Sequence, residues 1–159
     1  MSRSGADLAL LLLGGFRSLV DAAGTELADR GYDDVRPVHD FAIRAIADGA
    51  DSASELARRL SITKQSAAKT IGVLQERGYV ARDPDPHDAR RKRLQVTERG
   101  FELLRQGEAI FETLRDQWAQ RIGADELQGI EDHLRTLVGP QPVRFDTPAW
   151  IARDVGDPA

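Results

Sequence analysis

The stretch of sequence that decides the fold is Ser52–Gly100, SASELARRLSITKQSAAKTIGVLQERGYVARDPDPHDARRKRLQVTERG. It opens with Ser52-x-x-Glu55, a capping-box pattern in which the two side chains satisfy free amides at the start of a helix. The apolar residues that follow predict one short helix. Ser61-Ile62-Thr63 ends it, and Thr63 is placed to cap a second helix.

The second helix has two distinct faces. Ala67, Ile71 and Leu74 recur at helical spacing on one side, and a polar, cationic set lies toward the other. Arg77-Gly78, a cation followed by a glycine suited to a left-handed cap, marks its end. Two helices joined by a short turn, with polar side chains at the start of the second, indicate a helix-turn-helix.

Two short strands are predicted next, at Tyr79–Arg82 and Arg93–Val96. The segment between them is rich in turn-forming residues and ends in a run of cations. We therefore expect a β-hairpin wing with a basic tip. Thr97 is placed to cap a further helix.

These blocks resemble the MarR (multiple-antibiotic-resistance regulator) family of winged-helix transcription factors. The matching residues are Glu55-Leu56-Ala57 with Leu60, Leu74-x-Glu76-Arg77-Gly78-Tyr79-Val80, Asp88-x-Arg90, and Leu94-x-Val96-Thr97-x-x-Gly100. The resemblance implies a mainly α fold with a small β-hairpin wing (α+β). It also implies that the first helix and the last two helices interlock with a second copy of the chain.

The expected layout is a single MarR-like domain over residues 1–159. Residues 6–30 and 100–138 would form dimerisation helices, and residues 36–99 would form the winged helix-turn-helix DNA-binding lobe. Both terminal regions carry more apolar surface than a small lobe can cover, which favours a homodimer. Residues 139–159 are a Pro-rich C-terminal extension whose large apolar residues favour packing over a mobile tail: Phe145, Trp150 and Ile151.

The net charge of −4 hides a strong asymmetry. Residues 57–99 contain eleven Lys/Arg against five Asp/Glu, a net of +6, and the remainder contains eleven against twenty-one, a net of −10. A basic segment within an acidic chain is typical of a nucleic-acid-binding lobe. Because the segment coincides with the predicted helix-turn-helix and wing, we prefer this interpretation to that of a solvated helix face.

The predicted contacts with double-stranded DNA fall into two groups. The start of the second helix would enter the major groove, where side chains read base edges; its candidates are Thr63, Lys64, Gln65, Ser66, Ala68 and Lys69. In the wing, the resemblance implies that Arg90 reaches the minor groove and that Asp88 orients it through a salt bridge. Arg91 and Lys92 would attract phosphates.

An effector site is implied by the resemblance alone. Members of this family bind small aromatic or phenolic molecules between the dimerisation helices and the DNA-binding lobe. In this chain that cleft would be lined by Phe16, Tyr32, His39, Phe41, Phe111 and Trp118. Each of these residues is, by its type and spacing, more commonly a core residue than a ligand contact.

An enzyme is not expected. The chain has no cysteine, and the three histidines, His39, His87 and His133, show no metal-ligand spacing. No cofactor and no metal are expected. The apolar run Leu8–Leu13 is too short to span a bilayer and has no cationic segment before it, so the expected location is the cytoplasm, with no membrane partner.

The sequence thus predicts a dimeric, sequence-specific transcriptional regulator, by default a repressor of a pseudo-palindromic promoter operator that a small aromatic effector would release. Two alternatives stay open. One is a sequence-tolerant architectural DNA-binding protein, which the short side chains of Ser66, Ala68 and Gly72 would permit. The other is a degenerate family member that acts as a small-molecule- or protein-binding module.

Overall fold

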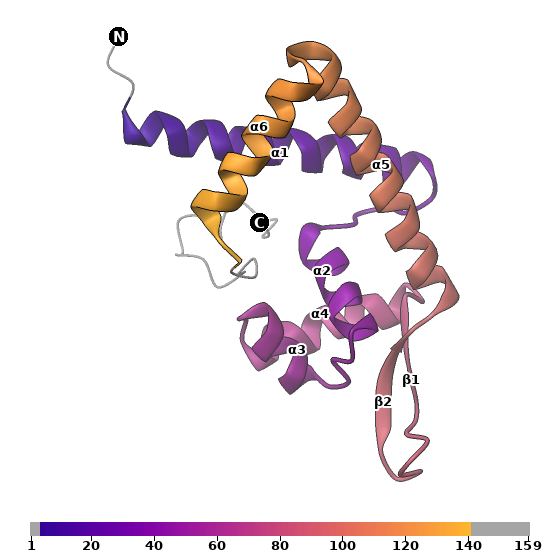
Figure 1. Cartoon of the computed structure of the whole chain (residues 1–159). Coiled ribbons are helices and arrows are strands. Elements are labelled where there is room, and N and C mark those ends of the chain that lie inside the picture. The colour runs from indigo at the N-terminus through magenta and orange to yellow at the C-terminus, as the bar shows by residue number, and fades with distance from the viewer. Residues whose placement is uncertain (1–3, 141–159) are drawn as a thin grey trace. The chain divides into compact units, whose positions relative to one another are not determined.

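The computed structural model describes residues 4–140 of the 159-residue chain. The described residues form two compact units, one made of residues up to Val35 together with Gln106–Pro140, and the other of Arg36–Arg105. The helices and strands are, in chain order, α1 (Gly5–Asp29), α2 (Pro37–Ala47), α3 (Ala53–Leu60), α4 (Lys64–Glu76), β1 (Val80–Pro84), β2 (Lys92–Val96), α5 (Glu98–Ile122) and α6 (Ala124–Val138) (Figure 1). The prediction of a mainly helical fold with one small hairpin is confirmed.

The Arg36–Arg105 unit is built around the buried faces of α2, α3 and α4. Its fully buried large side chains include Ile43, Leu56, Ile71 and Leu74. Since each comes from an apolar position at helical spacing, the three helices share one small core. Gly78, with φ of 75°, follows α4 in the left-handed conformation that its sequence position predicted.

The start of α3 differs from the predicted capping box. Ser52 does cap the helix, because its Oγ accepts a hydrogen bond from the backbone N–H of Glu55 at 3.2 Å. The Glu55 carboxylate, however, accepts hydrogen bonds from Arg58 and Arg59. Two guanidinium groups within one helical turn therefore take the carboxylate that a full capping box would use.

The wing is a two-stranded antiparallel hairpin that runs from Val80↔Val96 to Pro84↔Lys92. Strand β1 begins one residue later than predicted, because Tyr79 is buried and its N–H donates to Leu74 O at the end of α4. Both strands also extend further toward the tip than predicted, β1 to Pro84 and β2 from Lys92. Leu94 is buried as well and attaches β2 to the helical core.

A tight junction joins the wing to α5. The Thr97 hydroxyl donates to Gly78 O and accepts a hydrogen bond from Gly100 N, so Thr97 caps α5 as predicted. Gly100 packs directly against Tyr79 and Val96, and a Cβ at this position would lie only 2.7 Å from Val96 Cγ1. The Thr97-x-x-Gly100 pattern is therefore explained by the close approach of the start of α5 to the backbone of Gly78 and Tyr79.

The other unit consists of α1, α6 and the part of α5 from Gln106 onward. Helix α1 runs through Gly14 and Gly15 without interruption, and a Cβ on Gly15 would lie 3.5 Å from the Trp118 ring. Arg115 of α5 donates to both carboxylate oxygens of Glu131 on α6, at 2.7 and 3.1 Å. Gly123, with φ of 101°, separates α5 from α6.

This unit exposes many large apolar side chains. On α1 they are Leu8, Leu10, Leu11, Leu12 and Phe16, and on α5 and α6 they include Phe111, Ile122, Ile130 and Leu137. Helix α1 is also long and apolar enough to cross a membrane by length and composition, with a mean hydropathy of 1.4 over its most apolar stretch. The apolar segment is thus longer than the six-residue run considered in the sequence. Phe145, Trp150 and Ile151 lie outside the described residues.

Candidate nucleic-acid interface

Helix α4 begins with the cap that the sequence predicted. Thr63 Oγ1 accepts a hydrogen bond from Ser66 N at 3.0 Å and donates to Ser66 Oγ at 2.9 Å. The Thr63 hydroxyl is therefore used within the first turn of the helix. This fixes the direction in which α4 leaves the turn after α3.

The polar face of α4 is fully open to solvent. Every predicted major-groove residue is exposed: Thr63, Lys64, Gln65, Ser66, Ala68 and Lys69. The intervening Ala67 is completely buried, as is Leu74 further along. The structure thus gathers the predicted set on two successive turns of one helix, with the opposite face anchored in the core.

Helix α3 carries an ionic cluster that the sequence reading missed. Glu55 accepts hydrogen bonds from Arg58 and then Arg59, and these two contacts lower the pKa of its carboxyl from 4.5 to about 2. Arg59 also donates to Ala45 O and Asp48 O at the end of α2, at 3.3 and 2.9 Å. The i, i+3 and i, i+4 spacing of these charges was the available signal. Arg59 thereby fastens the first helix of the helix-turn-helix to α2.

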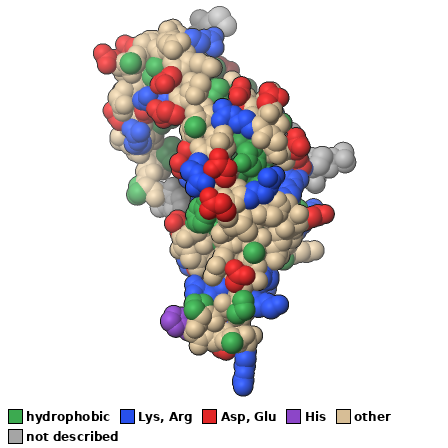
Figure 2. All heavy atoms as spheres, turned by 90° about the vertical axis from the view of Figure 1, so that its right-hand side faces the viewer, with side chains coloured by type: hydrophobic (Ala, Val, Ile, Leu, Met, Phe, Trp, Pro, Cys, Tyr) green, Lys and Arg blue, Asp and Glu red, His purple; other side chains and the backbone are tan. Residues whose placement is uncertain are grey.

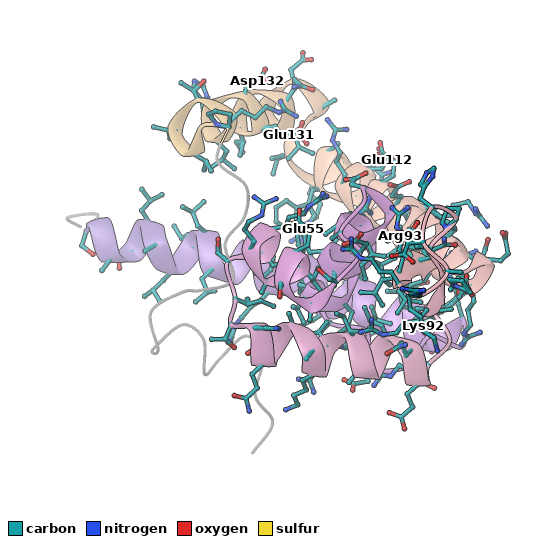
Figure 3. All side chains as sticks on the ribbon, turned by 90° about the horizontal axis from the view of Figure 1, so that it is seen from below. Glu55, Lys92, Arg93, Glu112, Glu131 and Asp132 are labelled. Atoms are coloured by element: carbon teal, nitrogen blue, oxygen red, sulfur yellow. The ribbon has the colours of Figure 1, made fainter. Side chains whose placement is uncertain are left out.

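The wing places its cations on an exposed hairpin. Arg90, Arg91 and Lys92 are all exposed, and Figure 2 shows Lys and Arg side chains gathered over the wing at the lower end of the view. Arg91 Nη2 lies 3.6 Å from Asp51 Oδ2, so part of its charge is balanced within the protein. Lys92 and Arg93 are neighbours on β2 and alternate in direction (Figure 3).

Asp88 acts differently from what the resemblance implied. Its Oδ1 accepts a hydrogen bond from the backbone N–H of Arg90 at 3.0 Å, and within the described chain no ion pair joins the two side chains. A short carboxylate two residues before an amide satisfies that amide most easily by a local turn contact. Asp88 therefore shapes the backbone of the wing tip, and the Arg90 side chain projects from it.

The three histidines occupy separate places. His39 is buried at the start of α2, where its Nδ1 accepts from Arg36 N at 3.2 Å, while His87 lies on the wing and His133 on α6. Within residues 4–140, no group of three or more His, Asp or Glu side chains could hold a metal ion.

The predicted effector residues divide between the two units. Phe16, Tyr32, Phe111 and Trp118 belong to the unit of α1 and α6, and Phe16 and Phe111 are 43% and 42% exposed. His39 and Phe41 belong to the other unit. A cleft shared by all six residues stays a prediction.

Comparison with known proteins agrees with this geometry. A model of the MarR family matches residues 41–91, which include α3, α4, β1 and the tip of the wing. Among solved structures, Streptococcus pneumoniae FabT in complex with DNA is similar, with a TM-score of 0.68 and 17% identity over 85% of this chain and 95% of that one.

Two similar structures hold small molecules. CouR from Rhodococcus jostii, bound to p-coumaroyl-CoA, has a TM-score of 0.61 and 21% identity over 90% of this chain and 100% of that one. A MarR family protein of Mycobacterium tuberculosis, in complex with p-aminosalicylic acid, has a TM-score of 0.61 and 23% identity over 83% and 98%. Residues 41–91 thus match the MarR family model, and the chain has the fold of the MarR-family structures to which it is similar.

Proposed function

We propose that this protein is a homodimeric, sequence-specific DNA-binding regulator that represses transcription by occupying a pseudo-palindromic operator. The observation that carries the proposal is the polar face of α4, whose predicted groove residues are all exposed and whose opposite face is buried. A helix held in this way can enter the major groove without disturbing its own core. The exposed cations of the wing supply attraction to the phosphate backbone.

The homodimer is supported by the exposed apolar residues of α1, α5 and α6. Leu11 is 73% exposed and Leu137 is 80% exposed, and many large exposed apolar side chains on a soluble domain favour a site of protein association. A two-fold dimer would present two copies of α4 to half-sites about 34–36 Å apart. Burial of α1 against a second copy also accounts for its apolar character in a cytoplasmic protein.

Release by a small aromatic effector is the finer part of the proposal. Its support is that two proteins of the same fold hold p-coumaroyl-CoA and p-aminosalicylic acid. Such a ligand would act only through a difference in affinity between the DNA-binding state and the released state. The six aromatic and histidine residues named above are its proposed contacts.

The decisive experiment is selection of binding sites by the full-length protein from a random duplex library. The selected duplex and a scrambled duplex are then compared across a salt series, with the oligomeric state measured by sedimentation equilibrium. We expect a two-fold related motif, bound by a dimer and preferred over the scrambled duplex. Equal and steeply salt-dependent binding to both would favour the architectural alternative, and binding to neither would favour the degenerate module.

A further inference from the structure

Asp51 joins the wing to the helical core through both its backbone and its side chain. It lies between α2 and α3, where its carbonyl oxygen accepts a hydrogen bond from Leu94 N at 3.2 Å. Its Oδ2 lies 3.6 Å from Arg91 Nη2 and 3.7 Å from Arg93 Nε. One residue beside the first helix of the helix-turn-helix therefore contacts three residues of the wing.

Asp85, in the loop between β1 and β2, brings a second carboxylate close to Arg93. Asp85 Oδ2 lies 3.9 Å from Arg93 Nε. Asp85 is itself fixed, because its Oδ1 accepts from His87 N at 2.8 Å and its own N–H donates to Arg91 O at 2.7 Å. The hydrogen bond from His87 keeps the pKa of Asp85 below its ordinary value, so this carboxylate stays charged.

The burial of these side chains separates the roles of the two arginines. The side chains of Asp85, Asp51 and Arg93 are 12%, 24% and 34% exposed, whereas that of Arg91 is 61% exposed. Arg93 thus lies between two carboxylates near the loop end of the strand pair. Arg91 has one long ion pair and stays open to solvent, so it can exchange Asp51 for a phosphate.

A two-stranded hairpin needs such an anchor. An isolated pair of strands is marginally stable in water, and partly exposed ion pairs add little to global stability. The bridge formed by Asp51, Arg93 and Asp85 therefore matters more for the direction of the wing than for the stability of the fold. That direction decides whether the wing and α4 can reach adjacent grooves at the same time.

We propose that Asp51, acting through Arg93, is a positioning residue that sets the wing relative to α4 and thereby determines how well the protein discriminates between DNA sequences. This inference rests on the proposed function. A wing that has lost the charge of the Asp51 side chain stays joined through the backbone bond from Leu94 N to Asp51 O, and it keeps its cations and hence its attraction to any phosphate backbone. It loses the fixed orientation that strengthens binding to one particular DNA sequence.

The test compares wild type with Asp51→Asn, which keeps the shape of the side chain and removes its charge. Asp40→Asn is the matched control, because it breaks an ion pair of the same unit that contains no wing residue, Asp40 with Arg44 at 2.7 Å. Hydrogen exchange of the free protein reports on the anchor without DNA. We expect faster exchange of the amides of residues 82–93 in Asp51→Asn, with α4 unchanged.

Binding to the selected and scrambled duplexes then tests discrimination. We expect Asp51→Asn to lose about tenfold in the ratio of the two affinities, through weaker binding of the selected duplex, while Asp40→Asn keeps the wild-type ratio. Arg93→Gln should lower the ratio similarly, and the double variant should lose no more than either single one, as expected for residues that act as one unit.

The contrary outcomes are distinct. An equal gain of affinity for both duplexes in Asp51→Asn would show that the carboxylate merely masks Arg91, and would overturn the positioning role. Unchanged exchange in the wing would overturn it as well. A wild-type protein that selects no duplex would overturn the proposed function and, with it, the role in discrimination. A wild-type protein that does select, beside an Asp51→Asn variant of unchanged ratio, would overturn this inference alone.

Discussion

Gly100 lies where the first turn of α5 meets the base of the wing. A Cβ there would lie 2.7 Å from Val96 Cγ1 and would also overlap the carbonyl oxygen of Tyr79. Because backbone cannot move aside as a flexible side chain can, we expect Gly100→Ala to lower the free energy of unfolding by about 1–3 kcal/mol, the usual cost of overpacking. Urea unfolding measures the effect. Gly24→Ala, with open space around the added methyl group, is the control, and equal midpoints for the two variants would contradict the argument.

We predict that Arg90 is the wing cation that reaches DNA. Its backbone is held by Asp88, and its side chain is exposed. Insertion of an arginine into a narrow minor groove reads DNA shape, and loss of an arginine contact with a base costs about 1–3 kcal/mol. We therefore expect Arg90→Ala to weaken binding of the selected duplex about tenfold or more, with an unchanged melting temperature.

Fluorescence anisotropy across a salt series measures this loss. Arg121→Ala is a suitable control, because Arg121 is an exposed arginine in the last turn of α5, outside the unit of α4 and the wing. If both variants bind like wild type, the wing takes no part in recognition.

Glu55 gives the protein a pH-dependent contribution to stability. Its pKa is lowered from 4.5 to about 2, first by Arg58 and then by Arg59. A depressed carboxyl pKa stabilises the folded state above the unfolded pKa, and this contribution is lost as the pH falls through the folded pKa. Glu55→Gln should therefore be less stable than wild type at pH 7, and the difference should shrink between pH 4.5 and pH 2.

Thermal unfolding at several pH values checks this expectation. Asp85 and Glu131 also have lowered pKa values, so wild type alone would lose stability in acid for several reasons. The comparison with Glu55→Gln isolates one carboxyl. Parallel curves for the two proteins over the whole acid range would rule out a contribution from Glu55.

At the scale of the element, α4 carries a glycine in its middle that its own structure does not require. Nothing lies within 4 Å of a Cβ built on Gly72, and a glycine within a helix costs up to about 1 kcal/mol relative to alanine. Gly72→Ala should therefore raise the unfolding midpoint in urea. Affinity for the selected duplex, measured on the same variant, then shows whether DNA approaches this turn closely. A lower midpoint would mean that the added methyl group meets an obstacle absent from the described structure.

The elements show which parts of the fold sequence alone can predict. Thr63, Thr97 and Gly78 act on their own neighbours in the chain, so their capping roles were readable from local spacing. The predicted capping box at Ser52 formed only in part, because the Glu55 carboxylate binds Arg58 and Arg59 and not the Ser52 amide. The sequence pattern alone does not say which of these partners the carboxylate prefers. The predicted start of β1 was one residue too early, because Tyr79 is buried in the core and is not part of the strand.

In the candidate site, too, the sequence predicted what local spacing decides and missed contacts that only the fold creates. Helical periodicity was enough to place Lys64, Gln65 and Lys69 on the open face of α4. The contacts of Asp51 with Arg91 and Arg93 were not predictable, because they join segments far apart in the chain whose proximity only the folded wing creates. The local contact between Asp88 and the Arg90 amide was missed because the resemblance suggested a side-chain pair instead.

At the scale of the whole molecule, the apolar surface of α1 has two possible explanations with opposite consequences. Leu11 is 73% exposed, and the helix passes the length and composition test for a membrane span. If α1 is buried in a dimer, a charge there must be desolvated at the interface or the dimer must dissociate. We expect Leu11→Glu to give a soluble, folded protein that sediments as a monomer and has lost most of its affinity for the selected duplex.

Thr25→Glu tests the same helix at an exposed polar position, and it should remain dimeric. The loss of DNA binding follows from the geometry, because one copy of α4 reaches only one half-site and the second half-site then contributes nothing to affinity. Sedimentation equilibrium of both variants at several concentrations distinguishes the outcomes. The membrane explanation would hold if wild type fractionates with membranes and shows no dimer, and if Leu11→Glu makes the protein soluble. That result would assign α1 to a bilayer and overturn the proposed dimer.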